Sequence, residues 1–310
     1  MEPRRKRWVW MIASVTLACL GAGAGVGVLF ERTFHRDGHA AAAVTTSINT
    51  STTPTLTAPS TSAVSSTTSS ATRSVFYLVG DSHTQFGSDV NGWATRLQSL
   101  YVRSVDVLNR GLADFNTQQF VEAGLPIVTK ELASSSFTPM VITLWFGLDD
   151  AALSDGPAAR HQVHVDKYYD NLVHILRTFR KQSPRSKILV VSPLVVDDDT
   201  RRQVLVQRDE LSGPIDRTNN MTKAYAAAAA EAASVLRDLA ISHLDLYSYL
   251  METYPNTTAR AALFRDGLHL NEEGHRVVFE QVRTRIELIV PASMLQTAQI
   301  PLPETARVGH

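Results

Sequence analysis

The sequence has one cysteine in 310 residues and no excess charge of either sign, since 30 Lys or Arg balance 30 Asp or Glu. A single cysteine excludes an intramolecular disulfide framework and any multi-cysteine zinc or iron–sulfur site. The balanced charge argues against a nucleic-acid binder that works through bulk positive charge. Hydrophobic residues make up 44% of the chain, which is enough to build a core and excludes disorder along its whole length.

Charged side chains are absent from residues 8–30, a run of 23 positions that directly follows a basic cluster at residues 4–7. A helix of this length spans roughly 30 Å of hydrocarbon. The positive-inside rule then places residues 1–7 in the cytosol and the rest of the chain in a lumenal or extracellular space. We therefore expect a single-pass signal anchor. The alternative is a signal peptide cleaved among the small residues 21–25, followed by secretion.

Acidic residues are missing from positions 45–73, where 19 of 29 residues are Ser or Thr. Such a stretch cannot bury enough apolar surface to become ordered. We assign residues 31–73 to a disordered stalk, either O-glycosylated or unmodified. N-glycosylation sequons at Asn49, Asn220 and Asn256 agree with a glycoprotein exposed on the lumenal side.

Residues 74–290 have the pattern of one α/β domain. Runs of β-branched and aromatic residues predict buried strands at 75–80, 105–109, 140–146 and 187–192. Helices are expected at 92–102, 166–181, 221–239 and 272–289. This alternation predicts a three-layer α/β/α sandwich with a central parallel sheet, whose active site lies at the carboxyl ends of the strands. Residues 291–310 read as a loose tail.

Four segments with reactive or small residues stand at the predicted strand ends or before the last helix. They are Gly80-Asp81-Ser82, Asn109-Arg110-Gly111, Gly147-Leu148-Asp149-Asp150 and Asp266-Gly267-Leu268-His269. A serine just past the first strand lies near a helix N-terminus, where backbone N–H groups favour negative charge. An Asp three residues before a His can orient the imidazole so that its other nitrogen deprotonates a serine. Taken alone, Gly80-Asp81-Ser82 is more commonly a strand-to-helix turn with a cap, and Asp266 and His269 are more commonly a capping Asp and a surface His.

The order of the four segments resembles that of the SGNH hydrolases, also called the GDSL esterase/lipase family, which have a flavodoxin-like α/β/α fold. The isoamyl acetate-hydrolysing esterase branch is the most similar one. The likeness is carried by residues 80–86, 92–93, 109–117, 146–153 and 266–270. It implies that Ser82 is the nucleophile, His269 the general base and Asp266 the residue that orients His269. It also implies that the backbone N–H groups of Ser82 and Gly111 bind the oxyanion, and that no metal or organic cofactor is needed.

Two residues depart from the family pattern. Asp149 replaces an Asn whose side-chain amide donates to the oxyanion, and an ionised carboxylate has no hydrogen to donate. Losing one such donor typically lowers turnover about 10²–10³-fold. Three outcomes are open: a protonated Asp149 that donates, a substitute donor, or a weakly active or inactive hydrolase. His83 stands where the branch usually has an apolar residue, and we expect it at the rim of the site.

The sequence as a whole predicts a membrane-anchored serine esterase that acts on small or medium acyl esters. A lumenal glycan O-acetylesterase or acetyltransferase, with an acylated glycan as its substrate, uses the same residues and is the first alternative. A pseudo-hydrolase that binds such ligands without turnover is the second alternative, and Asp149 is its motivation. No nucleic-acid partner is expected.

Overall fold

The structure is a computed structural model that describes residues 74–134, 137–208 and 213–296. The predicted signal anchor, the stalk and most of the predicted tail lie outside these residues. Within the three ranges, no helix combines the length and the apolar character that a membrane crossing requires.

A parallel sheet of five strands in the order β2-β1-β3-β4-β5 forms the centre of the fold. The strands are β1 (Ser74–Gly80), β2 (Val105–Gly111), β3 (Pro139–Trp145), β4 (Lys187–Val191) and β5 (Ile241–Leu244). The first four confirm the predicted strands. The fifth was missed, because this short strand carries two polar residues, Ser242 and His243, and is only half-buried.

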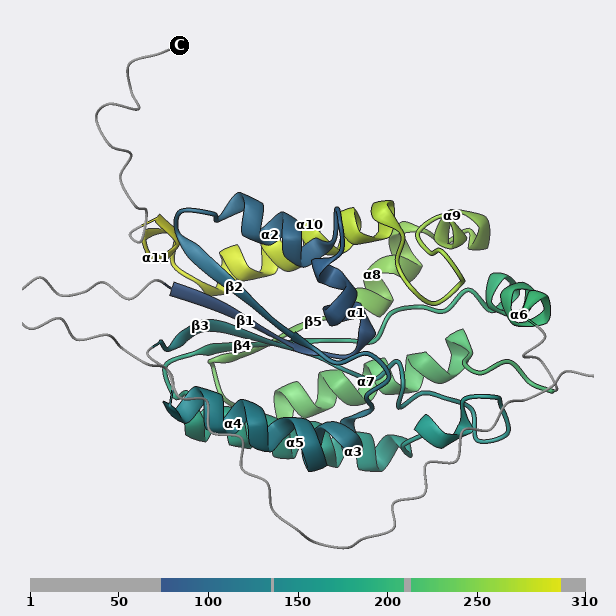
Figure 1. Cartoon of the computed structure of the whole chain (residues 1–310), viewed down its shortest axis with the longest axis horizontal. Helices are drawn as coiled ribbons and strands as arrows, with labels where there is room; N and C mark the ends of the chain where they lie inside the picture. The colour runs from purple at the N-terminus through teal and green to yellow at the C-terminus, as the bar shows by residue number, and fades with distance from the viewer. Residues whose placement is uncertain (1–73, 135–136, 209–212, 297–310) are drawn as a thin grey trace, which may run out of the picture. The chain divides into compact units, whose positions relative to one another are not determined.

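Helices cover both faces of the sheet (Figure 1). One face packs against α2 (Trp93–Leu100), α8 (Leu246–Thr253) and α10 (Glu272–Ile289), and the other against α4 (Leu125–Ser134), α5 (Val165–Gln182) and α7 (Asn219–Val235). Alternate residues of β1 serve the two cores: Phe76 and Leu78 face the first, whereas Tyr77 and Val79 face the second. The expected three-layer sandwich is confirmed.

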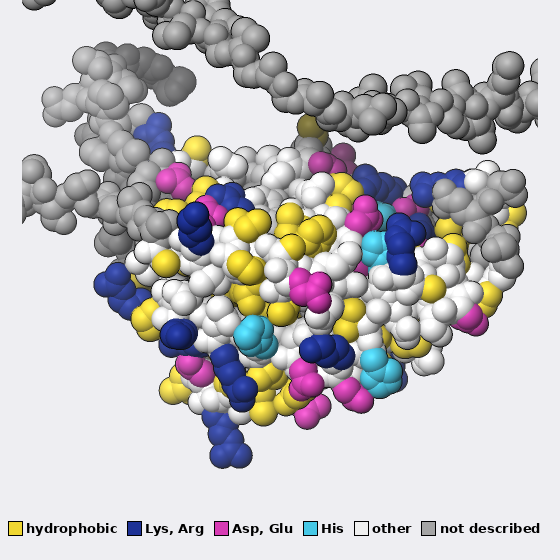
Figure 2. Space-filling view, turned by 60° about the horizontal axis from the view of Figure 1, so that its bottom comes forward, with side chains coloured by type: hydrophobic (Ala, Val, Ile, Leu, Met, Phe, Trp, Pro, Cys, Tyr) yellow, Lys and Arg dark blue, Asp and Glu magenta, His cyan; other side chains and the backbone are white. Residues whose placement is uncertain are grey.

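Shorter helices connect these elements. They are α1 (Ser82–Gln85), α3 (Thr117–Gln119), α6 (Asp198–Gln207), α9 (Thr257–Ala261) and α11 (Ala292–Gln296). Because α11 lies within the expected tail, the first part of that segment is helical rather than loose. On the face that carries α4 and α5, basic and acidic side chains are interspersed among hydrophobic ones (Figure 2).

The connections of β1 decide where a ligand can bind. The chain passes from β1 to β2 on one side and then crosses back to β3 on the other side of β1. Such a reversal opens a crevice at the carboxyl ends of the strands. Ser82, Gly111 and Asp149 follow or end β1, β2 and β3, so the fold brings these three predicted residues to one edge.

Candidate active site

Ser82 is the first residue of α1, two positions beyond the end of β1. Asp81 caps this helix: its side chain accepts hydrogen bonds from the backbone N–H of His83 at 3.0 Å and of Leu148 at 3.4 Å. The Asp81 N–H in turn donates to the Trp145 carbonyl at 3.0 Å. Ser82 is thus held on a turn fixed to β3, and it stands at the start of a helical turn, where negative charge is favoured.

The Ser82 hydroxyl is buried and makes no hydrogen bond to any residue that the structure describes. A buried hydroxyl without a partner is uncommon and calls for an explanation. A nucleophile that gains its partner only when substrate binds is one such explanation, because catalytic hydrogen bonds are often incomplete without substrate.

His269 and Asp266 are hydrogen-bonded to each other as predicted. Nδ1 of His269 lies 2.8 Å from Oδ2 of Asp266, and the backbone N–H of His269 donates to Oδ1 at 2.7 Å. Burial alone would raise the pKa of Asp266, but the hydrogen bonds from His269 and the positive charge of Arg201 hold it well below its ordinary value. Asp266 is therefore ionised and fixes the orientation of the imidazole.

The imidazole of His269 lies against the segment that begins with Ser82. Its ring centroid is 5.5 Å from that of Phe86 and 6.1 Å from that of His83. The structure therefore brings Ser82, Asp266 and His269 to the same edge, although the Ser82 hydroxyl and His269 are not hydrogen-bonded here.

The predicted rim position of His83 is wrong. Its side chain is buried, stacks on Trp145 with a centroid distance of 5.2 Å, and has Nε2 3.1 Å from the carbonyl oxygen of Leu268. Because a carbonyl only accepts, Nε2 carries a proton in this contact. His83 thus links α1 to the residue that precedes His269.

Gly111 lies next to α1, but its backbone N–H donates to Oδ1 of Asn109 at 2.8 Å. A Cβ at this position would lie 2.1 Å from the backbone nitrogen of Gln85, so only glycine allows the end of β2 to approach α1 so closely. Asn109 joins the same two elements by donating to the Thr84 carbonyl at 2.6 Å. To bind an oxyanion, the Gly111 N–H would have to exchange Asn109 for the substrate.

Asp149 is buried and forms an ion pair with Arg217. Nε of Arg217 also donates to the Leu148 carbonyl at 2.7 Å, and its Nη1 donates to Asp216 at 2.7 Å. Burial raises the pKa of Asp149 against the opposing charge of Arg217. The direct contact with a guanidinium favours the carboxylate form, which has no hydrogen to donate to an oxyanion.

Asp150 belongs to the same loop and is fully buried. It accepts hydrogen bonds from the backbone N–H of Thr117 at 3.0 and 3.1 Å, and from the Thr117 hydroxyl. Burial raises the pKa of Asp150 to about 8, against the effect of these hydrogen bonds. Asp150 ties the loop after β3 to α3, and its role in the site is to hold the loop that carries Asp149.

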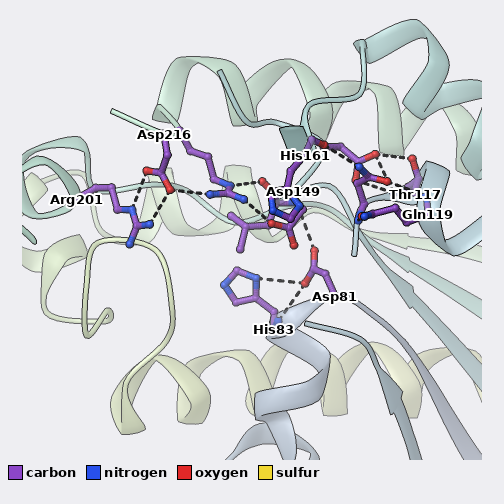
Figure 3. A network of polar contacts seen from close by, with 12 residues as sticks. Asp81, His83, Thr117, Gln119, Asp149, His161, Arg201 and Asp216 are labelled. Atoms are coloured by element: carbon purple, nitrogen blue, oxygen red, sulfur yellow. Dashed lines mark hydrogen bonds and ion pairs between the residues drawn. The ribbon is translucent and has the colours of Figure 1, made fainter. Parts of the chain in front are cut away.

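Three residues near the site were missed by the sequence analysis: Arg201, Asp216 and Arg217. Arg201 donates to Asp216 from Nε at 2.8 Å and from Nη2 at 2.6 Å, and to Asp266 from Nη1 at 3.3 Å. Figure 3 shows Asp216 between the two guanidinium groups. Arg201 lies in α6, which lacks an apolar stripe, and Asp216 and Arg217 follow that helix. Nothing in the sequence pattern there indicated that these side chains are buried near the site. The unbalanced charge of Asp149 was the only indication that a cation had to lie nearby.

A polar pocket of about 480 Å³ borders these residues. Its lining includes Asp114, His161, Arg201, Asp216 and Arg217. Because Arg201 contacts Asp266 and Arg217 contacts Asp149, the pocket opens beside the candidate site. Most ligand sites are lined mainly by apolar side chains, so a pocket with this lining suits a polar ligand.

Comparison with known proteins identifies the family. The model of the GDSL-like lipase/acylhydrolase family matches residues 78–277, which is more than half of the chain. The chain belongs to this family. Among curated GDSL proteins, an Arabidopsis thaliana GDSL esterase/lipase is 32% identical over 68% of this chain and 84% of its own length. An isoamyl acetate-hydrolyzing esterase 1 homolog of Bos taurus is 29% identical over 68% and 80% of the two chains.

Solved structures agree on the fold of this GDSL-family chain. An acetylxylan esterase from Geobacillus stearothermophilus has a TM-score of 0.52 at 16% identity, with 69% of this chain and 94% of that chain covered. A lipase/acylhydrolase from Enterococcus faecalis has a TM-score of 0.50 at 20% identity, over 69% and 95%. Membership of this family of esterases makes the protein a carboxylic ester hydrolase of the SGNH/GDSL type.

Proposed function

We propose that this GDSL-family enzyme is a serine esterase that cleaves small or medium acyl esters through an acyl-serine intermediate. The observation that carries the proposal is the hydrogen-bonded pair of His269 and Asp266 beside the segment that begins with Ser82. The unpartnered hydroxyl of Ser82 supports it, because a nucleophile must be able to meet both base and substrate.

Each residue of this proposed triad has one role. Ser82 Oγ attacks the ester carbonyl carbon while Nε2 of His269 accepts the serine proton. Asp266 holds Nδ1–H of His269 and stabilises the imidazolium that forms. His269 then gives the proton to the leaving alcohol, and a water molecule repeats the attack on the acyl-serine to release the acid.

The proposed oxyanion donors are the backbone N–H groups of Ser82 and Gly111. Gly111 contributes once its N–H has left Asn109. Asp149 adds no donor while it is a carboxylate paired with Arg217, so turnover is expected to be about 10²–10³-fold below that of a site with a third donor.

A fluorophosphonate serine probe and a short p-nitrophenyl ester test the proposal on the full chain. Wild-type protein should be labelled and should hydrolyse the ester. Ser82→Ala should abolish labelling, and Ser82→Ala and His269→Ala should each lower hydrolysis by at least about 10³-fold. Ser99→Ala, which changes an exposed serine on α2, is the matched control and should behave as wild type.

Two results would contradict the proposal. Hydrolysis by Ser82→Ala at the wild-type rate would show that Ser82 is not the nucleophile. A folded wild-type protein that neither reacts with the probe nor cleaves any ester would be a pseudo-hydrolase that binds acyl or glycan ligands.

A second candidate function is the O-deacetylation, or the acetyl transfer, of an acylated glycan. The polar pocket beside Asp149 and Asp266 favours it, because guanidinium, carboxylate and imidazole groups suit the hydroxyls of a sugar better than an alkyl chain. Faster release of acetate from acetylated oligosaccharides than from p-nitrophenyl acetate would support this candidate, whereas the opposite preference would support simple esters. We also propose that the enzyme acts outside the cytosol, attached through residues 8–30.

A further inference from the structure

An unbroken row of alternating charges connects the loop after β3 to the proposed triad. In order, it runs through Asp149, Arg217, Asp216, Arg201 and Asp266, and ends at His269. We call these six residues the buried ion-pair row. Figure 3 shows the part of the row that includes Asp149, Asp216 and Arg201. Each neighbour in the row is held by at least one hydrogen bond between side chains.

The row draws together segments that are far apart in the sequence. Asp149 follows β3, Arg201 belongs to α6, Asp216 and Arg217 precede α7, and Asp266 precedes α10. All five of these charged residues are buried. Buried charges are tolerated only when they are paired and hydrogen-bonded, so the position of each of them depends on its neighbours.

Arg201 occupies the decisive place in the row. Two of its nitrogens donate to Asp216, at 2.8 and 2.6 Å, and the third donates to Asp266 at 3.3 Å. Asp216 therefore fixes the plane of the guanidinium. The remaining nitrogen of Arg201 donates to Oδ2 of Asp266, the same oxygen that is hydrogen-bonded to Nδ1 of His269. A planar fork can hold two carboxylates in this way, whereas an ammonium cannot.

The charges of the row also suit the proposed reaction. Three carboxylates and two guanidinium groups sum to −1, and an imidazolium at His269 brings the sum to zero. Without Arg201 the same groups would sum to −2 around a neutral His269. Such an excess of negative charge stabilises the imidazolium before any substrate is present.

We propose that Arg201 is a positioning residue of the esterase site, which holds Asp266 in line with His269 and balances the negative charge beside it. The proposal rests on the proposed function of Ser82, Asp266 and His269. Arg201 donates to Asp266, which in turn holds His269, so we expect it to act on the base through that carboxylate.

Other titratable groups surround the Asp266–His269 pair. His83 faces His269 from α1, and Asp81 lies 3.6 Å from the His83 ring. Arg265 lies over the Phe86 ring, which contacts His269, at 4.8 Å. Burial, and the neighbouring charge of His83 after it, lower the pKa of His275 to about 4, so His275 is neutral in the pH range of the assay. These groups are common to wild type and to the variants below.

The test is the pH profile of kcat/KM for ester hydrolysis by the full chain, normalised to the sites labelled by a fluorophosphonate probe. The acid limb of this profile reports the protonation of the free base. Arg201→Met should lower kcat/KM about tenfold to a hundredfold, because Oδ2 of Asp266 loses the restraint that Arg201 supplies. It should also shift the acid limb upward by about 0.5 to 1 pH unit, because the imidazolium becomes more stable.

Two further variants separate charge from geometry. Arg201→Lys keeps the charge and loses the fork, so its acid limb should stay at the wild-type pH while kcat/KM falls. The double variant Arg201→Met with Asp216→Asn restores a sum of −1, so its acid limb should return close to the wild-type pH while kcat/KM stays low. Without Arg201, the buried Asp216 carboxylate would keep only its bond to Arg217. Because the double variant removes that charge, it also serves if Arg201→Met alone does not fold.

Arg180→Met is the matched control. Arg180 forms a similar partly buried ion pair with Asp238 at 2.6 Å and donates to the Ser186 carbonyl, which precedes β4 at the opposite end of the sheet. This variant should lose stability without any change of the pH profile.

The outcomes distinguish the two levels of the proposal. If wild type is active and Arg201→Met has the same kcat/KM and the same acid limb, the role of Arg201 is overturned and the esterase function is left intact. If Arg201→Met gives fewer labelled sites but its acid limb stays at the wild-type pH, Arg201 has only a structural role and the proposal is overturned. A wild type without labelling or hydrolysis would overturn the esterase function itself.

Discussion

Asp149 and Arg217 form a buried ion pair in the loop that carries the family's third oxyanion donor. Replacing this Asp by Asn would exchange an acceptor for an amide that can donate. Arg217 would keep its contacts with Leu148 and Asp216, so the loop stays joined to Arg217 through Leu148.

We expect Asp149→Asn to raise kcat at least about tenfold, because an added oxyanion donor stabilises the transition state. The same change should lower the melting temperature, since removing one partner of a buried ion pair costs about 3–5 kcal/mol. Steady-state kinetics and thermal unfolding measure the two effects. Asp149→Ala breaks the pair without supplying a donor, and equal kcat values for the Asn and Ala variants would contradict the prediction.

At the scale of elements, the site depends on how closely the end of β2 approaches α1. A side chain on Gly111 would meet the backbone nitrogen of Gln85 at 2.1 Å and its Cα at 2.5 Å. Backbone atoms cannot move aside as a flexible side chain can, so any substitution pushes α1, and Ser82 with it, away from β2.

Gly111→Ala should therefore lower stability by about 1–3 kcal/mol and kcat/KM by about 10²-fold. Denaturant unfolding and ester hydrolysis check both values. A Cβ on Gly213 would meet no atom within 4 Å, so Gly213→Ala should leave both unchanged. Wild-type kinetics in Gly111→Ala would show that α1 tolerates displacement.

Elements with a strong apolar pattern were predictable from the sequence, and those that bury polar groups were not. The apolar runs of β1, β3 and β4 and the stripe on α5 gave correct strands and a correct helix. Helix α6 buries Arg201 and Leu205, so it offered no apolar periodicity. Local spacing predicted the Asp266–His269 contact, because the two residues are only three positions apart in the sequence. The contacts of Arg201 join distant segments, and only the fold reveals them.

At the scale of the whole molecule, we propose that the N-terminal 73 residues decide where the enzyme works. We expect the full chain to remain in the membrane pellet after alkaline carbonate extraction, because residues 8–30 are long and apolar enough to span a bilayer. A chain that begins at residue 74 should stay in the supernatant and keep its esterase activity. A full-length gene product found in the medium, shortened by about 25 residues on mass analysis, would indicate a cleaved signal peptide instead.

The position of β1 has a consequence for how the protein is made. This strand lies inside the sheet, yet both of its partners, β2 and β3, follow it in the chain. During synthesis β1 leaves the ribosome with two open edges, which is the state most prone to non-native pairing. Ser82 emerges with it, whereas Asp266 and His269 come from the last part of the domain. The proposed nucleophile is thus made first and its proposed base last, so we expect catalytic activity only after the last part of the domain has folded.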